Sequence, residues 1–265
     1  MESRAVDNTD WLKAAAIILV VVDHTGYFFI KDADWWHVFG RMAAPIFFFL
    51  LGYATSRTVP VRWIGVGVIL TLLESWNAGW AWVAPNILLS LALIRLVRPY
   101  AQAFLQRHGW VAFAVFISAL IAVLPIASNI FDFGAEGWLW ALFGLCQRIY
   151  VDGNDGNSTA EVDSHAMTQN MGLMRLLACV VAAVVYVWQE QMEFSFSQIQ
   201  FTVFIFGVGV LILSLCAFRR GPSRVQPQEP IAGSLRFFGR YTLEIYAIQL
   251  AGSELIIRLL PALAP

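Results

Sequence analysis

Long apolar segments recur along the whole chain, and they constrain its fold more than any other feature. A helix that spans a bilayer needs about 20 predominantly apolar residues, with a lower limit near 17. Nine segments approach or exceed that length, so we predict an all-α, polytopic transmembrane helical bundle with about nine spans (eight to ten) in a single domain over residues 1–265. The predicted spans are 11–30, 36–56, 61–76, 82–98, 110–130, 136–151, 171–189, 199–218 and 234–260.

The composition agrees with a membrane location. Hydrophobic residues make up 59% of the chain and charged residues 13%, whereas about a quarter of the residues of an ordinary soluble domain are charged. The net charge of -1 gives no reason to expect a nucleic acid as partner. No small-residue cleavage site follows the first apolar segment, so we expect a retained span rather than a signal peptide. The polar stretches 152–169 and 221–230 are expected to be loops.

The positions of the basic residues indicate the orientation. With the N-terminus in the cytoplasm, the lysines and arginines fall at or near cytoplasmic loops, apart from Lys31, Arg41 and Arg258. Positive charge is concentrated on the cytoplasmic side of membrane proteins. We therefore predict a cytoplasmic N-terminus and, with an odd number of spans, an external C-terminus.

The first predicted span carries ionisable side chains at membrane depth, where each costs roughly 2.5–3.5 kcal/mol on insertion scales. Lys13 and His24 are eleven positions apart, which places them within about 20° of the same helix face and about 16 Å apart along the axis. Lys13 is thus expected at the cytoplasmic mouth and His24 beyond the middle of the membrane. Asp10 is expected to cap the helix. An imidazole changes charge near neutral pH, so His24 can accept and return a proton.

The second span is expected to bring Arg41 to a depth similar to that of His24, where Arg41 and Asp23 could pair. Gly26 would allow a neighbouring segment to approach closely. Acidic residues at the outer ends of later spans are expected at the same level: Glu74, Asp132 and Glu136. Tryptophans are expected to form an interfacial aromatic belt: Trp35, Trp36, Trp76, Trp80 and Trp82. Polar contact between helices is the structural alternative for His24.

Several of these segments resemble the TraX-type pilin acetyltransferase family, which is related to the acyltransferase type 3 proteins among transmembrane acyl transferases. The resemblance rests on DWLKAAAIILVVVDHTGYFF (10–29), GRMAAPIFFFLLGYA (40–54), Asn86, FDFG (131–134) and Gly137. Acyltransferase type 3 relatives have an arginine where Lys13 stands and often a histidine where Gln249 stands. Lysine keeps the charge of arginine but lacks its bidentate geometry.

The resemblance implies transfer of an acetyl or other acyl group from cytosolic acyl-CoA to a hydroxyl or amine acceptor at the outer side of a bacterial inner membrane. The acceptor would be a surface glycan, lipid or protein. His24 would be the general base, with Asp23 or another acid holding its tautomer and Arg41 stabilising the developing charge. Basic cytoplasmic residues are the candidates for binding the CoA phosphates: Lys13, Arg57, Arg62, Arg95 and Arg98.

Two other functions remain open from the sequence. The first is a proton- or ion-coupled transporter with a relay formed by Asp23, His24, Arg41 and Glu74, although no internal repeat is visible. The second is a non-catalytic scaffold in which these residues only join helices. We expect no metal site, because the histidines are dispersed and the three cysteines lack ligand spacing.

Overall fold

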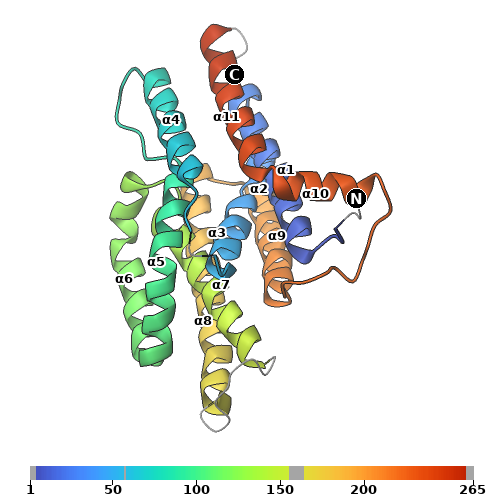
Figure 1. Ribbon diagram of the computed structural model, residues 1–265. Helices are drawn as coiled ribbons and strands as arrows, with labels where there is room; N and C mark the ends of the chain where they lie inside the picture. The colour runs from blue at the N-terminus through green and yellow to red at the C-terminus, as the bar shows by residue number, and fades with distance from the viewer. Residues whose placement is uncertain (1–3, 57, 155–163, 261–265) are drawn as a thin grey trace. The chain divides into compact units, whose positions relative to one another are not determined.

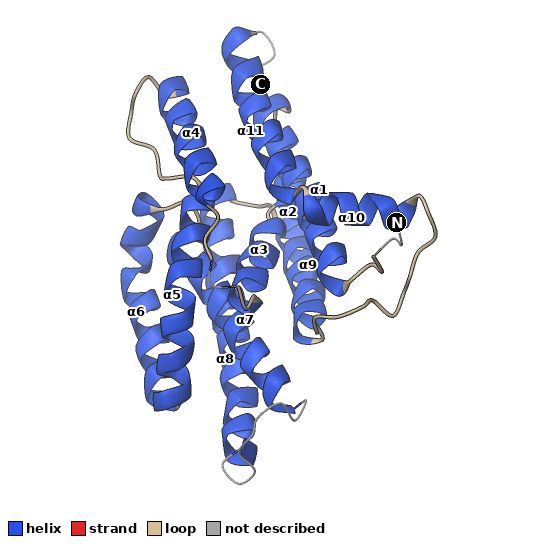
Figure 2. Cartoon of the chain, in the orientation of Figure 1, coloured by secondary structure: helices blue, strands red, loops and turns tan. Residues whose placement is uncertain are grey.

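A computed structural model describes residues 4–56, 58–154 and 164–260 (Figure 1). The regular secondary structure of these residues is helical, which confirms the all-α class (Figure 2). Five of the described helices are long and apolar enough to cross a membrane by length and composition. They are Asn8–Phe29, Ile87–His108, Trp110–Ala127, Asn170–Phe194 and Gln198–Cys216. The chain is therefore a helical membrane protein, while the count of about nine spans and the cytoplasmic N-terminus stay predictions.

The chain forms two compact units, whose boundaries fall inside two of the helices. Unit 1 is Met1–Phe47 with Gln191–Pro265, and unit 2 is Phe48–Glu190. Unit 1 contains α1 (Asn8–Phe29), α2 (Asp34–Gly40), the start of α3 (Ala43–Tyr53), the end of α8 (Ser164–Phe194), α9 (Gln198–Cys216), α10 (Ile231–Arg240) and α11 (Thr242–Leu259). Unit 2 contains the rest of α3 and α8 with α4 (Val61–Asn77), α5 (Ile87–His108), α6 (Trp110–Ile130) and α7 (Gly134–Asn154).

Helix α1 begins one turn earlier than the sequence hypothesis placed it. Its N-cap is Asp7, whose carboxylate accepts hydrogen bonds from backbone N–H groups of the first turn. Asp10 is the third helical residue, and its carboxylate accepts from the Asp7 N–H at 3.0 Å. Together the two aspartates form a capping box. The prediction that Asp10 is the N-cap is therefore wrong, because Asp7 satisfies the same pattern one turn before it.

The predicted span 36–56 is not one continuous helix. Helix α2 ends at Gly40 and α3 begins at Ala43, with a turn between them that contains Arg41. Pro45 lies in the first turn of α3, where its missing N–H is tolerated, whereas in a continuous helix it would remove a hydrogen bond and clash with the preceding turn. The break places Arg41 at the end of a helix of 7 residues instead of inside a long span.

The predicted span 234–260 is also two helices, α10 and α11, which meet at Tyr241. In Figure 1, α10 lies crosswise to α1 and α11, whereas α11 runs alongside α1. The polar interruption at this bend, Arg240 to Thr242, is too brief to end a span when hydropathy is averaged over a long window. The bend separates a short helix near the start of α1 from a longer one that packs along it.

In unit 2, small residues bring α3 and α7 together. A Cβ atom at Gly52 would collide with the backbone of Ala141, and one at Gly144 would collide with the backbone of Phe49. The buried Arg98 of α5 donates from Nε to the Gly52 carbonyl oxygen at 2.9 Å. A buried cation is costly unless it is hydrogen-bonded, so this contact joins α5 to the close pair α3 and α7.

Candidate functional site

Four ionisable side chains of unit 1 meet in a group that we call the Asp23 cluster: Asp23, His37, Arg41 and Glu193. The His37 Nδ1–H donates to Asp23 Oδ1 at 2.9 Å, and Arg41 Nη1 lies 3.8 Å from Asp23 Oδ2. Arg41 Nη2 also donates to Glu193 Oε1 at 2.9 Å. The predicted pairing of Asp23 with Arg41 is confirmed. Because Asp23 and His37 are buried and Glu193 is exposed, the cluster links an interior carboxylate to the surface.

An aromatic ring supports two members of the Asp23 cluster, His37 and Arg41. The His37 ring stacks on Phe194 with ring centroids 4.5 Å apart, and the Arg41 guanidinium carbon lies 4.8 Å from the centroid of the same ring. A cation above an aromatic face is attracted by the ring quadrupole. Phe194, at the end of α8, therefore contacts both His37 and Arg41 and supports their positions.

Two glycines allow α1 and α2 to approach closely enough to form the cluster. A Cβ atom at Gly40 would collide with Cβ and Cα of Asp23, and one at Gly26 would collide with Cβ of Trp36. The close approach expected at Gly26 is therefore confirmed, with a tryptophan side chain as the neighbour. Small residues at helix contacts are a common means of close packing in membranes.

His24 belongs to a second contact, between α1 and α11. Its Nδ1 lies 2.7 Å from Gln249 Oε1, and its ring centroid is 5.9 Å from that of Tyr246. An amide oxygen only accepts hydrogen bonds, so the His24 Nδ1–H is the donor and Nε2 keeps its lone pair. At the other end of α1, Lys13 Nζ donates to the Gly239 carbonyl oxygen at 3.4 Å. Helices α1 and α11 therefore run parallel.

Asp23 and His24 face different neighbours because adjacent residues of an α-helix point about 100° apart. Asp23 faces α2, and His24 faces α11. The hypothesis that Asp23 or another acid holds the His24 tautomer differs from the structure, in which the neutral amide of Gln249 contacts Nδ1. The carboxylate of Asp23 instead binds a different imidazole, that of His37.

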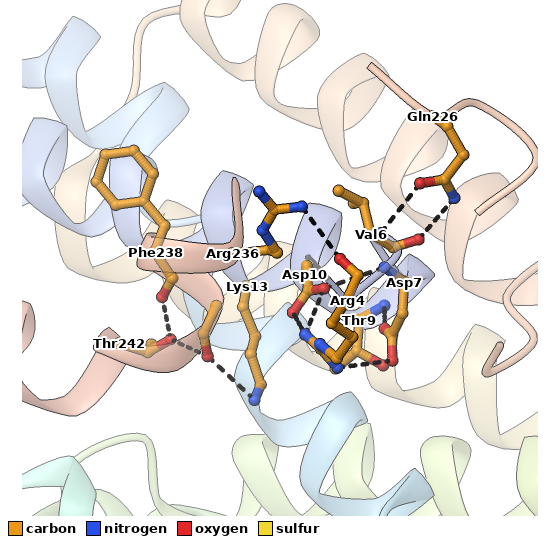
Figure 3. A network of polar contacts seen from close by, with 11 residues as sticks. Arg4, Val6, Asp7, Thr9, Asp10, Lys13, Gln226, Arg236, Phe238 and Thr242 are labelled. Atoms are coloured by element: carbon orange, nitrogen blue, oxygen red, sulfur yellow. Dashed lines mark hydrogen bonds and ion pairs between the residues drawn. The ribbon is translucent and has the colours of Figure 1, made fainter. Parts of the chain in front are cut away.

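At the N-terminal end of α1, Asp10 and Lys13 belong to a separate polar network (Figure 3). Arg4 Nη2 donates to both carboxylate oxygens of Asp10, at 2.8 and 2.7 Å. Arg236 of α10 donates to the Arg4 carbonyl oxygen at 3.0 Å. Together with the contact from Lys13 to Gly239, these bonds connect the start of α1 to α10. Lys13 thus lies near the N-terminal end of α1, as the sequence predicted, and is about 16 Å from His24 along the helix.

Arg57 lies outside the described residues. The predicted CoA-binding residues other than Lys13 and Arg57 lie in unit 2. Arg62 is exposed on α4. The Arg95 guanidinium carbon is 5.1 Å from the centroid of the Trp63 ring, and Arg98 is bonded to the α3 backbone. Three of the predicted CoA-binding arginines are thus described in unit 2, and one of them, Arg98, has a clear structural role. Their part in binding CoA stays a prediction.

Three further polar residues that the sequence pointed to lie in unit 2. Glu74 is exposed on α4, and Glu136 is buried in the first turn of α7. Asn86 caps α5 by accepting a hydrogen bond from the Leu88 N–H at 3.2 Å. Of the tryptophans predicted to form an interfacial belt, the exposed ones are Trp35, Trp36, Trp80 and Trp82.

The comparisons with known proteins identify the family. The TraX protein family matches residues 8–215, a range that includes Asp23, His24, His37 and Arg41. The chain belongs to the TraX protein family. Gln249 lies beyond the matched range, so the contact between His24 and Gln249 joins the TraX segment to a part of the chain that the match does not cover.

The curated relatives are similar to part of the chain. It is 27% identical to Protein TraX of Escherichia coli (strain K12) over 147 residues, which are 53% of this chain and 56% of that protein. It is 31% identical to another Protein TraX of Escherichia coli over 149 residues, with the same two shares. An uncharacterized protein of Rickettsia prowazekii (strain Madrid E) is 26% identical over 125 residues, 47% of this chain and 50% of the relative. The chain thus spans about half the length of the curated relatives it matches, and no solved structure matches it.

Sequence reasoning missed His37 and Glu193 as members of the site. His37 precedes Arg41 by four positions, a spacing that places two residues on one helix face, and this was a usable signal once Arg41 was expected beside Asp23. Glu193 had no such signal, because it lies at the end of α8 and is distant in the sequence from its partner Arg41. Gln249 was noted only as a departure from a family pattern, although it is the residue that contacts His24.

Proposed function

We propose that this TraX-family protein is a membrane-embedded acyltransferase that moves an acetyl or other acyl group from cytosolic acyl-CoA to a hydroxyl or amine acceptor at the outer side. His24 is its general base. The observation that carries the proposal is the 2.7 Å contact between His24 Nδ1 and Gln249 Oε1. This contact fixes the imidazole in the tautomer whose Nε2 can accept a proton.

In the proposed step, His24 Nε2 takes the proton of the acceptor O–H or N–H while the oxygen or nitrogen attacks the thioester carbonyl carbon. The new C–O or C–N bond forms, and the C–S bond of acyl-CoA breaks. The proton then passes from the imidazolium to the departing CoA thiolate. The products are the acylated acceptor and free CoA, so the imidazole returns to its starting state. General base catalysis of this kind contributes about 10²- to 10⁴-fold.

Arg41 stabilises the negative charge that develops on the carbonyl oxygen. Its guanidinium is held by Asp23 at 3.8 Å and by Glu193 at 2.9 Å, and a fixed direction is what distinguishes preorganised stabilisation from an ordinary surface charge. Asp23 acts through Arg41 and His37, so its role is to position them.

The acyl donor enters from the end of α1 that carries Lys13. The distance of about 16 Å along α1 from Lys13 to His24 suits the long, slender pantetheine arm of CoA, with the thioester near His24 and the phosphates at the membrane surface. Charge-assisted hydrogen bonds from basic side chains hold the phosphates. The proposed set is Lys13, Arg57, Arg62, Arg95 and Arg98.

The test uses the purified full chain in proteoliposomes with [¹⁴C]acetyl-CoA outside the vesicles and bacterial envelope extract as the source of acceptor. The proposal expects saturable binding of acetyl-CoA, release of free CoA thiol and appearance of the label on an envelope component. Lys13→Gln is expected to weaken acetyl-CoA binding, with Lys31→Gln as the matched control. A chain that neither binds acetyl-CoA nor consumes its thioester would overturn the proposal.

A transporter remains the second candidate because of one observation, the break between α2 and α3 beside the Asp23 cluster. Interrupted helices frequently line ion and substrate sites in transporters. A transporter would carry protons or ions across the same proteoliposomes in response to its substrate and leave acetyl-CoA intact. The two readouts, thiol release and internal pH, therefore separate the two candidates in one preparation.

A further inference from the structure

Three parts of unit 1 come together away from His24: the N-terminal end of α1, the segment after α9 and helix α10. Asn8 donates from its side chain to the Arg219 carbonyl oxygen at 2.8 Å, and its N–H donates to the Gly221 carbonyl oxygen at 3.0 Å. The segment after α9 thus lies against the start of α1. Helix α10 contacts the same region through the bonds of Arg236 and Lys13 (Figure 3).

Helix α10 has two unlike faces. One packs against the start of α1 in a small apolar cluster of Val6, Ala14, Ala232 and Leu235, with Phe238 beside it. The opposite side leaves two aromatic side chains exposed, Phe237 at 52% and Tyr241, directly after the helix, at 37%, and Ile231 at the helix start is 56% exposed. The two aromatic rings lie together, with the Phe237 and Tyr241 centroids 5.0 Å apart. An amphipathic helix with exposed aromatic residues suits the boundary between lipid headgroups and acyl chains.

One arginine lies directly beside this exposed aromatic pair. The Arg240 guanidinium carbon lies 5.4 Å from the centroid of the Tyr241 ring. The segment that joins α9 to α10 exposes three more arginines. We call these four residues the α10 arginines: Arg219, Arg220, Arg224 and Arg240. Basic clusters next to a membrane segment attract anionic lipid headgroups by about 1 kcal/mol per residue.

We infer that α10 lies in the plane of the membrane interface, inserts Phe237 and Tyr241 among the upper acyl chains and binds anionic phospholipid headgroups through the α10 arginines. The expected depth of α1 in the membrane agrees with this position of α10. Gly239 of α10 meets Lys13, and Lys13 is about 16 Å from His24 along the helix. With α10 at the interface, His24 lies near the middle of a hydrocarbon core about 30 Å thick. The inference does not depend on the proposed acyl transfer.

The first test measures the depth of α10 in the bilayer. Nitroxide labels are placed by Phe237→Cys, by Phe206→Cys on the exposed face of α9 and by Gln228→Cys in the polar linker, in a full chain whose three native cysteines are replaced by alanine. Collisions with O2 and with a water-soluble nickel complex report the depth of each label in vesicles. We expect Phe237 to lie between the deep Phe206 label and the aqueous Gln228 label. A Phe237 label as accessible to nickel as that at Gln228 would overturn the interfacial position.

The second test measures binding of fluorescent phosphatidylglycerol to the detergent-solubilised full chain, with phosphatidylcholine as the neutral competitor. The triple variant Arg219→Gln/Arg220→Gln/Arg224→Gln is expected to lose affinity for phosphatidylglycerol by roughly fivefold per arginine, the value for one charge at an anionic surface. Lys31→Gln/Arg107→Gln/Arg258→Gln removes the same charge elsewhere and is expected to bind normally.

Equal affinity of the two triple variants would overturn the assignment of the headgroup site. Free CoA is the other plausible source of phosphate for these arginines, and it provides a further arm of the experiment. Displacement of phosphatidylglycerol by CoA from the wild-type chain, but not from the Arg219/Arg220/Arg224 variant, would assign the arginines to a soluble phosphate ligand and likewise contradict the inference. Absence of displacement supports a lipid surface.

Discussion

Helix α1 carries two buried aspartates, Asp10 and Asp23, which obtain their hydrogen-bond and ion-pair partners in different ways. Asp10, 4% exposed, lies in the first turn, where free backbone N–H groups are available, and it accepts from the Asp7 N–H and from Arg4. Asp23, 9% exposed, lies far inside the helix, where the backbone N–H groups are already used. It therefore takes side chains from outside α1, namely His37 and Arg41.

The difference explains why the two aspartates obtain their partners from different parts of the chain. The first four N–H groups of a helix have no intrahelical partner, so a carboxylate there is satisfied locally. A carboxylate inside a membrane helix is satisfied only by another helix, and residues of this kind usually mark functional sites. Asp10 accordingly joins α1 to its own N-terminal segment, whereas Asp23 sets the positions of His37 and Arg41, which come from outside α1.

The largest effect is expected from Asp23→Asn compared with Asp10→Asn. Removing the charge at Asp23 leaves His37 without its carboxylate and Arg41 with Glu193, and breaking a buried ion pair in this way costs about 3–5 kcal/mol. Asparagine at position 10 still accepts a hydrogen bond at the helix start, so the loss is expected to be below about 1 kcal/mol. Denaturant unfolding in mixed micelles measures both. Equal losses would remove the distinction between the two aspartates.

A smaller effect is expected when the contact between α1 and α2 is widened. Gly40→Ala places a methyl group against Asp23, and overpacking of this kind costs about 1–3 kcal/mol. Gly209→Ala is the matched control, because its Cβ meets nothing within 4 Å and alanine stabilises a helix by up to about 1 kcal/mol. Thermal unfolding in detergent is expected to show a lower midpoint for the first variant alone. A Gly40→Ala protein as stable as Gly209→Ala would contradict the close approach.

The smallest effect is expected from Gln249→Leu, which removes the acceptor for His24 Nδ1–H. A neutral hydrogen bond contributes about 0.5–1.5 kcal/mol, so acyl transfer is expected to fall by roughly twofold to tenfold with stability nearly unchanged. Gln249→Glu keeps an acceptor at this position and is expected to retain most of the activity. The ratio of the two transfer rates, measured at saturating acetyl-CoA, is the test. If both variants transfer at the same rate, Gln249 does not position the imidazole.

The sequence predicted much of unit 1 because the relevant signals are local. Apolar length located α1 and α9, and the eleven-residue spacing predicted that Lys13 and His24 lie on one face of α1, where they contact α10 and α11. The pairing of Asp23 with Arg41 followed from their expected depth. These inferences depend on helix geometry alone, which the sequence fixes well once a segment is known to be helical.

The helix breaks and the partner of His24 could not be predicted in the same way. The breaks before α3 and before α11 lie at short polar interruptions, beside Arg41 and Arg240, that are too brief to end a predicted apolar span, although Pro45 was a local signal for the first. The contact of His24 with Gln249 joins positions 225 apart in the sequence, and the choice of an amide over an acid depends on which face of α11 meets α1. Such contacts depend on tertiary packing, which the residue pattern of a single sequence does not specify.

The most direct test of the account is the rate of acetyl transfer by His24→Asn, measured with [¹⁴C]acetyl-CoA in proteoliposomes and normalised to folded protein. Asparagine keeps a polar side chain of similar size but cannot accept and return the proton. His108→Asn, at the end of α5, is the matched histidine control. The account predicts that His24→Asn loses about 10²- to 10⁴-fold in rate, while acetyl-CoA binding and the His108→Asn variant stay normal. Transfer by His24→Asn at the wild-type rate would contradict the assignment of His24 as the base.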